Sequence, residues 1–236
     1  MILAPIPEMY GKTRRSGFKR YPSSWFDAQV STVDDIAHCC RPMSSDEVSS
    51  ALWTLHSGWL GSELANQWRR RLQEQVDWQQ PTVQVYGRRH LVPRLTTFLA
   101  EEGLRYRYSG TVHNGEGWPL WFRPLLDRVN EACDVRFNGC LLNLYRNGDD
   151  RMGWHADDEP EIDQQCPIAS LSLGGSRDFV LRERTALKRK VSLQLSDGDL
   201  LVMHSGCQQR WMHSLPTRRR VLSTRINLTF RCFQSA

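Results

Sequence analysis

The chain has 236 residues, of which 40% are hydrophobic and 24% are charged, and its formal net charge is +5. This length and composition suffice for one good hydrophobic core, with room for an extension. No apolar run approaches the roughly 18 residues that a membrane span needs, and the first residues do not resemble a secretory signal. The seven cysteines include no Cys-x-x-Cys pair and indicate reduced thiols. We therefore expect a soluble, monomeric protein of the cytoplasm, or of the nucleus if the source is eukaryotic, without a membrane partner.

The first half of the chain is predicted to contain an irregular extension followed by helices. Residues 1–45 lack sustained periodicity and predict an irregular extension, either a flexible leader, which we favour, or a basic arm for nucleic acid. A Ser-Ser-Asp-Glu pattern that starts at Ser44 matches a helix start. Residues 61–76 place four apolar side chains on one helical stripe, which predicts an amphipathic helix packed on the core. Further helices are predicted at 93–102 and 119–133.

Short strands follow the helices and are separated by Gly, Asp, Pro and basic turns. We predict them at about 139–145, 168–173, 177–184, 190–195, 199–204, 209–215 and 222–232. Helices followed by many short strands predict an α+β fold with a double-stranded β-helix (jelly-roll) core and helices packed on one sheet.

His155, Asp157 and His213 are the candidate metal ligands. Alternate residues of a strand point the same way, so His155 and Asp157 can hold one ion from a strand end, while His213 would come from a distant strand. Two imidazoles and one carboxylate form the ligand set of a mononuclear iron(II) site that keeps open positions. The tripeptide alone is a weak signal, because the acidic residues around it can also form a solvated surface loop.

The last predicted strand alternates strictly between polar and apolar residues. Arg225, Asn227, Thr229 and Arg231 share one face, and the other face is apolar. With a turn at Pro216, the strands of His213 and Arg225 are expected to form an antiparallel hairpin. Buried guanidinium groups need an anion, and a small dicarboxylate that also chelates iron would provide one. Asn143 and Tyr145 alternate in the same way. The alternative is a salt-bridged outer strand.

These residues carry a family resemblance. The pattern N-x-Y-x-x-G-x-D-x-x-x-x-H-x-D at 143–157, together with His213 and R-x-N-x-T-F-R at 225–231, resembles the AlkB family of Fe(II)- and 2-oxoglutarate-dependent nucleic-acid dealkylases. The likeness covers roughly residues 80–233 and is strongest to the DNA repair branch. It implies three parts: an extension at 1–45, a helical region at 46–134 with a nucleotide-recognition lid (a hairpin at about 83–110), and a jelly-roll core at 135–236.

The resemblance also implies the site and its chemistry. The cofactor would be Fe(II), held by His155, Asp157 and His213, and 2-oxoglutarate and O2 would be the cosubstrates. The far carboxylate of 2-oxoglutarate would be clamped by Arg225 with help from Tyr145, and the rest of that pocket would be lined by Asn143, Asn227, Thr229 and Arg231. The implied activity is oxidative repair of 1-methyladenine and 3-methylcytosine in DNA. It would convert 2-oxoglutarate and O2 to succinate and CO2 and release formaldehyde.

A methylated base must leave the stack to reach iron. By resemblance, the base pocket would include Tyr106, Tyr108 and Ser109, with Asp158 accepting a hydrogen bond from the exocyclic amine and Glu159 supporting it. Two tyrosines at i and i+2 are equally typical of one packed strand face.

Tyr86 matches by position the aromatic finger that relatives acting on duplexes insert into DNA. Apolar residues are more usual there, and a hairpin aromatic that packs on its own domain is the equal alternative. Phosphate contacts are expected from basic residues of this hairpin and of the loop segment at 182–190, namely Arg88, Arg89, Arg184, Lys188, Arg189 and Lys190. That loop looks shorter than in relatives specific for duplexes.

Two other function classes remain open from the sequence. An oxygenase acting on RNA or protein would use the same iron and cosubstrate residues. A non-catalytic nucleic-acid binder should have lost a ligand or the clamp, and neither is lost here. Strand preference, the choice of DNA or RNA and the range of lesions do not follow from the sequence.

Overall fold

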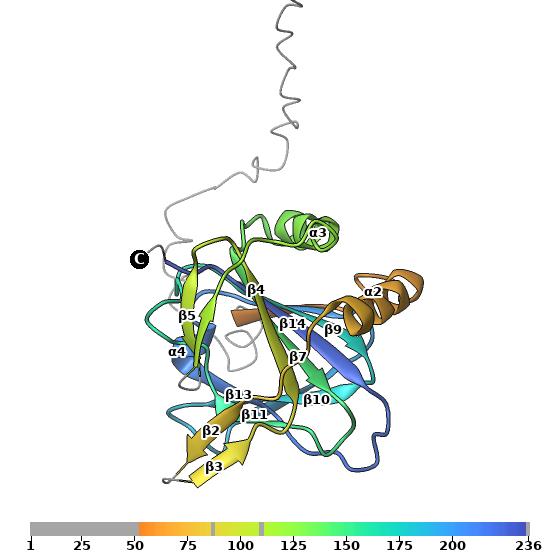
Figure 1. The fold of residues 1–236 in the computed structure, drawn as a ribbon. Helices are drawn as coiled ribbons and strands as arrows, with labels where there is room; N and C mark the ends of the chain where they lie inside the picture. Colours follow the sequence, from red (N-terminus) through yellow and green to blue (C-terminus); the bar gives the residue numbers. More distant parts are fainter. Residues whose placement is uncertain (1–51, 86–87, 109–110, 235–236) are drawn as a thin grey trace, which may run out of the picture. The chain divides into compact units, whose positions relative to one another are not determined.

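The computed structural model describes residues 52–85, 88–108 and 111–234, which form two facing antiparallel sheets (Figure 1). The larger sheet has six strands, in the order β1 (Trp53–His56), β12 (Leu200–Met203), β9 (Ile168–Gly174), β14 (Arg225–Arg231), β7 (Gly139–Tyr145) and β4 (Leu95–Ala100). The smaller sheet has four, in the order β11 (Lys190–Leu195), β10 (Arg177–Glu183), β13 (Trp211–Leu215) and β8 (Met152–His155). Two such sheets with crossing connections agree with the predicted jelly roll.

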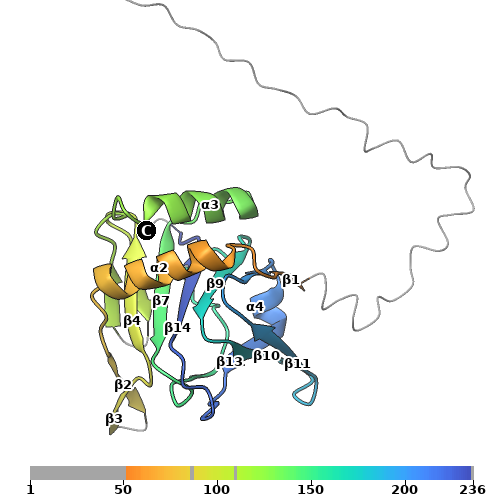
Figure 2. The same ribbon diagram turned by 90° about the vertical axis from the view of Figure 1, so that its right-hand side faces the viewer.

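Two helices, α2 (Ser62–Gln75) and α3 (Arg123–Cys133), lie across the outer face of the six-stranded sheet (Figure 2). The apolar stripe of α2 buries Trp68 and Leu72, and α3 buries Leu125 and Val129. These side chains form one core with the outward residues of the central strands, including Leu142, Leu171, Ile226, Leu228 and Phe230. Burial of apolar surface on this face stabilises the sheet that carries the polar pocket on its other side.

The inner face of the same sheet is divided. One end, around Trp53, Leu201 and Met203, packs on Phe179 and Leu181 of the smaller sheet and is apolar. The other end presents the polar alternate residues of β14, and all seven residues of that strand are buried. The alternation predicted from the sequence therefore divides β14 between a helix-covered core and an inter-sheet pocket.

Two small hairpins lie outside the two main sheets, one before β4 in the chain and one after it. The first joins β2 (Thr82–Val85) to β3 (Arg88–Leu91), and Figures 1 and 2 show it projecting beyond the main sheets. The second joins β5 (Arg105–Tyr108) to β6 (Thr111–Asn114). Tyr106 of β5 is buried against Phe98 of β4 and Phe233, with ring centroids 5.5 and 4.8 Å apart, so this hairpin is anchored on the larger sheet.

Two predictions are wrong. Residues 95–100, predicted as part of a helix, form β4, which pairs with β7 over six residues. Adjacent threonines favour a strand. An apolar run this short fits either a helix or a strand, and pairing with the free edge of the sheet makes it a strand. The strands of His213 and Arg225 also form no hairpin with each other, because β13 pairs with β10 and β8 while β14 pairs with β7 and β9.

The other predicted helices are present as α2 and α3, and the helix start at Ser44 lies outside the described residues. A short helix, α4 (Cys207–Arg210), precedes β13. Within the described ranges, no helix has both the length and the apolar character needed to cross a bilayer.

Candidate functional site: a His-Asp-His centre between two sheets

A pocket lies between the two sheets and collects side chains from seven strands. From the larger sheet it is lined by Leu141, Asn143, Tyr145, Ser170, Met203, Arg225, Asn227, Thr229 and Arg231. From the smaller sheet and its loops it is lined by Met152, His155, Asp157, Phe179, His213, Ser214 and Leu215. The nine residues expected to hold iron and cosubstrate are therefore gathered around one cavity.

The three candidate ligands converge because β8 and β13 are neighbours. His155 is the last residue of β8 and lies directly opposite His213 in register, with ring centroids 4.2 Å apart. Asp157 follows two residues after His155, and its carboxylate turns back toward it, with Oδ1 3.8 Å from His155 Nε2. One ligand atom from each of the three residues lies within 4.8 Å of the other two.

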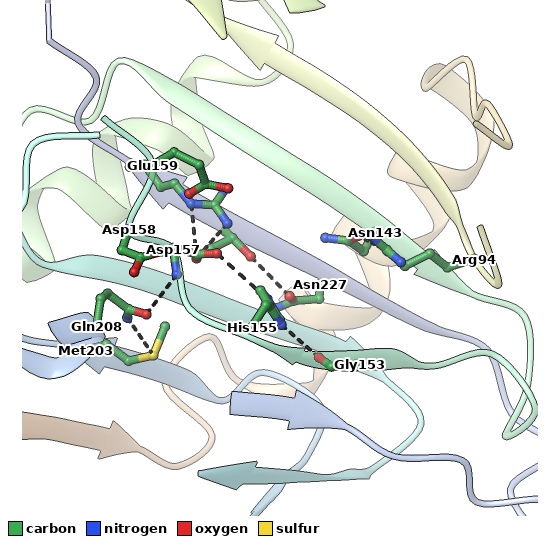
Figure 3. Close-up of polar contacts among 12 residues, drawn as sticks. Arg94, Asn143, Gly153, His155, Asp157, Asp158, Glu159, Met203, Gln208 and Asn227 are labelled. Atoms are coloured by element: carbon green, nitrogen blue, oxygen red, sulfur yellow. Dashed lines mark hydrogen bonds and ion pairs between the residues drawn. The ribbon is translucent and has the colours of Figure 1, made fainter. Parts of the chain in front are cut away.

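Hydrogen bonds fix the orientation of the ligands. His155 Nδ1 lies 2.9 Å from the carbonyl oxygen of Gly153, which can only accept, so the proton is on Nδ1 and the Nε2 lone pair faces the site. Figure 3 shows His155 between that carbonyl and Asp157. The backbone N–H of Asp157 donates to Gln208 Oε1 at 3.1 Å. His213 is stacked on Phe179, with ring centroids 5.1 Å apart.

The protonation states suit a divalent cation. Burial and the neighbouring His155 lower the pKa of His213 to about 3, and burial likewise lowers the pKa of His155. Burial disfavours the ionised form of Asp157, but the charge of Arg231 outweighs it and holds the pKa of that carboxyl below its usual range. Two neutral imidazoles and an ionised carboxylate are the donor set for Fe(II), so the residues fit the metal.

Arg225 forms the anion-binding part of the pocket. It is 2% exposed, donates from Nη2 to Ser172 Oγ at 2.9 Å, and lies over the ring of Tyr145, 5.4 Å from its centroid. Its Nε is buried without a hydrogen-bond partner in the described chain, and burial lowers the pKa of the guanidinium to about 10. A buried cation with an open donor indicates a site for an anion such as a carboxylate.

The neighbouring polar side chains hold one another. Asn227 Nδ2 donates to Ser170 Oγ at 2.8 Å and to the Leu171 carbonyl at 3.0 Å, while Thr229 donates to Asn227 Oδ1 at 3.2 Å. Asn143 Oδ1 accepts from Arg94 Nε at 2.7 Å (Figure 3). This network sets the shape of the pocket wall before any ligand enters.

The expected base-side carboxylates differ in their surroundings. Glu159 Oε1 accepts from the hydroxyl of buried Tyr106 at 3.1 Å, while Glu159 Oε2 is buried without a hydrogen-bond partner among the described residues. Burial, reinforced by the charge of Asp157, raises the pKa of Glu159. Asp158 instead lies at the surface and accepts from Arg184 Nη2 at 2.6 Å.

The structure does not describe all the candidate contacts to nucleic acid. Tyr86 and Ser109, and the side chains of Arg88 and Tyr108, lie outside the part of the chain that is described. Arg89, Lys188 and Lys190 are exposed, and Arg189 donates to Glu183 at 3.0 Å.

Several residues of the site were missed by sequence reasoning. Ser170 and Ser172 carried a usable signal, because two serines alternate on a strand that is otherwise apolar. Arg94 was placed at the start of a helix that does not form, and Gln208 has no sequence signal. Arg231 was expected to line the cosubstrate pocket, and it also donates to Asp157 at 2.7 and 3.1 Å.

Comparison with known proteins identifies the family. Residues 53–231 match the 2OG-Fe(II) oxygenase superfamily. The chain belongs to this superfamily. As a member it is a dioxygenase that uses Fe(II), 2-oxoglutarate and O2, and the His-Asp-His centre described above suits the iron.

The chain is also similar to curated members of the AlkB family. The chain is 41% identical over 156 residues to DNA oxidative demethylase ALKBH2 of Mus musculus (63% of this chain, 65% of the relative) and 39% identical to ALKBH2 of Homo sapiens (63% and 60%). It is 35% identical over 187 residues to human alpha-ketoglutarate-dependent dioxygenase alkB homolog 3 (75% and 64%). Each match spans less than two thirds of the relative's length.

A solved structure supports the fold of the oxygenase. The structure of OsALKBH1 superposes with a TM-score of 0.53 at 19% sequence identity, covering 76% of this chain and 97% of that one.

Proposed function

We propose that the protein demethylates N-methylated bases in DNA, with 1-methyladenine and 3-methylcytosine as substrates, and thereby repairs alkylation damage. The observation that carries the proposal is a set of three converging metal-ligand side chains beside Arg225, which is buried without an anionic partner, and beside Glu159, which keeps one buried oxygen open. The relatives named DNA oxidative demethylase support DNA as the substrate.

The positive charge of Arg225 determines where 2-oxoglutarate binds. Arg225 binds the far carboxylate of 2-oxoglutarate through its open Nε, and Ser172 and Tyr145 keep the guanidinium in place. The iron ligands are His155, Asp157 and His213. When bound, the iron with 2-oxoglutarate and O2 supplies the oxidising chemistry that hydroxylates the N-methyl group, and the products are succinate, CO2 and formaldehyde.

Base recognition uses the carboxylates that follow Asp157. Tyr106 is 1% exposed between aromatic neighbours, so its hydroxyl orients Glu159 more readily than its ring stacks on a base. The open oxygen of Glu159 can accept a hydrogen bond from the exocyclic amine of adenine or cytosine. Thymine and guanine have a carbonyl oxygen at the equivalent position, which cannot donate this hydrogen bond. Asp158 assists from the rim, where Arg184 holds it.

The proposal is tested by formaldehyde release from a substrate panel. Oligonucleotides with one 1-methyladenine or 3-methylcytosine should release formaldehyde only when Fe(II), 2-oxoglutarate and O2 are all present. His155→Ala and Asp157→Ala should abolish release, while His56→Ala, on an edge strand away from the pocket, should not. Release from methylated RNA or peptide but not from DNA would overturn the proposal in favour of an RNA or protein oxygenase.

A further inference from the structure

The outer face of the four-stranded sheet carries an aromatic residue beneath two cations. We call Trp154, Arg182, Met212 and Lys190 the Trp154 cluster. The guanidinium carbon of Arg182 lies 4.2 Å from the centroid of the Trp154 ring, and Lys190 Nζ lies 5.9 Å from it. Arg182 crosses β13 to reach the indole, with Nη2 3.7 Å from the sulfur of Met212. The cluster therefore spans all four strands of the sheet, β11, β10, β13 and β8.

The charge of this cluster is not balanced. Neither Arg182 nor Lys190 forms an ion pair with any described residue, and Arg182 Nε is buried without a hydrogen-bond partner. The nearest carboxylates in sequence are occupied. Glu183 pairs with Arg189 and Arg210, and Asp158 pairs with Arg184. Two positive charges without a carboxylate partner on one surface indicate an anionic partner.

The indole of Trp154 indicates that the partner also offers a flat ring that can stack on it. Trp154 is 36% exposed and is the most exposed of the tryptophans that the structure describes. The Arg182 guanidinium lies over the ring, and the part of the indole that stays exposed can stack an unpaired base while the cations hold phosphates. A duplex would offer the phosphates but no free base face. The combination therefore favours a single strand.

The cluster is next to the metal centre in the chain. Trp154 immediately precedes His155 on β8, and alternate residues of a strand face opposite sides of its sheet, so the two rings lie on the two sides of the same sheet. The register between β8 and β13 shifts between His213 and Leu215, beside this position. A strand that delivers one nucleotide to the pocket can thus pass its neighbours over the sheet edge to Trp154.

We infer that the Trp154 cluster binds single-stranded nucleic acid that flanks the nucleotide in the pocket, stacking one base on the indole and holding its phosphates with Arg182 and Lys190. This inference rests on the proposed function, because it assumes a nucleic-acid substrate in the pocket. It goes beyond that function by assigning a second contact surface outside the pocket.

Binding of unmodified oligothymidylate to the full chain tests the surface without any turnover. Trp154→Ala should weaken binding of a fluorescently labelled 12-mer about tenfold, and Trp154→Phe should weaken it less, because a smaller ring still stacks. The double variant Arg182→Gln/Lys190→Gln should reduce the slope of log affinity against log salt by about 1.4, which is about 0.7 for each lost phosphate contact on a single strand.

A matched control exists on another face of the molecule. Arg128 of α3 lies over the ring of Trp59, with its guanidinium carbon 5.7 Å from the ring centroid. Arg128→Gln removes a similar contact between an arginine and a tryptophan ring. It should leave unchanged both the affinity for the 12-mer and the slope of log affinity against log salt. Thermal unfolding of every variant establishes that the comparison is between folded proteins.

Turnover separates this inference from the proposed function. Trp154→Ala should keep formaldehyde release from a trinucleotide with a central 1-methyladenine and lose rate only on longer single strands at low concentration. If the wild-type protein releases no formaldehyde, the proposed function fails while the binding experiment still decides the surface. The inference is overturned if Trp154→Ala binds the 12-mer like wild type, or if it weakens binding of duplex DNA as much as that of the single strand.

Discussion

Arg231 donates two hydrogen bonds to the same oxygen of Asp157, from Nη2 at 2.7 Å and from Nε at 3.1 Å. Both side chains are 3% exposed. Oδ2 is thus occupied, and Oδ1, which faces His155, is the oxygen left for a metal. A carboxylate held in this way offers one ligand atom and keeps coordination positions open for cosubstrate.

Arg231→Gln should weaken metal binding without removing a ligand. Loss of an outer hydrogen-bond partner of a ligand typically costs about 10- to 100-fold in metal affinity. Calorimetric titration with Mn²⁺, which replaces Fe²⁺ without oxidising, measures the loss. The same variant should lose about 3–5 kcal/mol of unfolding free energy, because it leaves Asp157 buried and without its charged partner.

Arg136→Gln provides the control for Arg231, since it removes an exposed cation and makes the same change in net charge. It should bind Mn²⁺ like wild type. Equal Mn²⁺ affinity in wild type and Arg231→Gln would show that the arginine does not orient the ligand.

Arg225→Met should separate stability from cosubstrate binding. Because Arg225 is buried without an anion, its removal should leave the unfolding temperature of the ligand-free protein unchanged or higher. The Michaelis constant for 2-oxoglutarate should rise about 10- to 100-fold, as expected for a lost charge-assisted hydrogen bond. Thermal unfolding with Mn²⁺, with and without 2-oxoglutarate, measures both effects. A variant that is still stabilised by 2-oxoglutarate to the wild-type extent would contradict the assignment.

The C-terminal strand could be predicted from its sequence because strict alternation of polar and apolar residues fits only a strand with one polar and one apolar face. Strict alternation from Arg225 to Arg231 placed the polar residues on one face, and the structure buries that face in the pocket. By contrast, residues 95–100 carry no such pattern, and the free edge of β7, which the sequence does not reveal, makes them a strand.

The partners of the site were harder to predict than its ligands. The donation from Arg231 to Asp157 joins residues 74 positions apart, and the one from Asp157 to Gln208 joins residues 51 apart. Such pairs follow from the packing of two sheets, which local patterns do not encode. The Trp154 cluster was missed for the same reason, since it collects four residues from four strands.

Gly148→Ala should disrupt the junction of two loops. A Cβ at Gly148 would lie 1.7 Å from the carbonyl oxygen of Arg218, at a place where the two backbones exchange hydrogen bonds. Neither backbone can move without breaking the bonds from Gly148 N to Val221 O and from Arg218 N to Gly148 O, both 2.7 Å long. We expect a loss of about 3 kcal/mol or more in urea unfolding, in the upper range for single substitutions.

Gly153→Ala is the matched control for Gly148→Ala, since a Cβ there meets nothing within 4 Å. It keeps the carbonyl that binds His155 and should change the unfolding free energy by less than about 0.5 kcal/mol. Similar losses in both variants would point to a general intolerance of alanine in this part of the chain rather than to the contact with Arg218.

Arg177 should act as a positioning residue for the cosubstrate end. It is 2% exposed and donates to three backbone carbonyls, those of Asn147 at 3.0 Å and of Asp150 and Pro216 at 2.8 Å each. It thereby ties the loop after β7 to the loop after β13, and its guanidinium lies 5.9 Å from the ring centroid of Tyr145, the residue that supports Arg225. A lysine cannot span three carbonyls in different directions.

Arg177→Lys should therefore raise the Michaelis constant for 2-oxoglutarate several-fold while changing the turnover number at saturating 2-oxoglutarate by less than about twofold, since it alters binding and not the reacting groups. Steady-state formaldehyde release at varied 2-oxoglutarate separates the two constants. Arg218→Lys, which alters a partly exposed pair with Asp178 nearby, serves as the control and should leave both unchanged. If Arg177→Lys lowered the turnover number and left the Michaelis constant unaltered, Arg177 would act on the reaction itself rather than on the position of the cosubstrate.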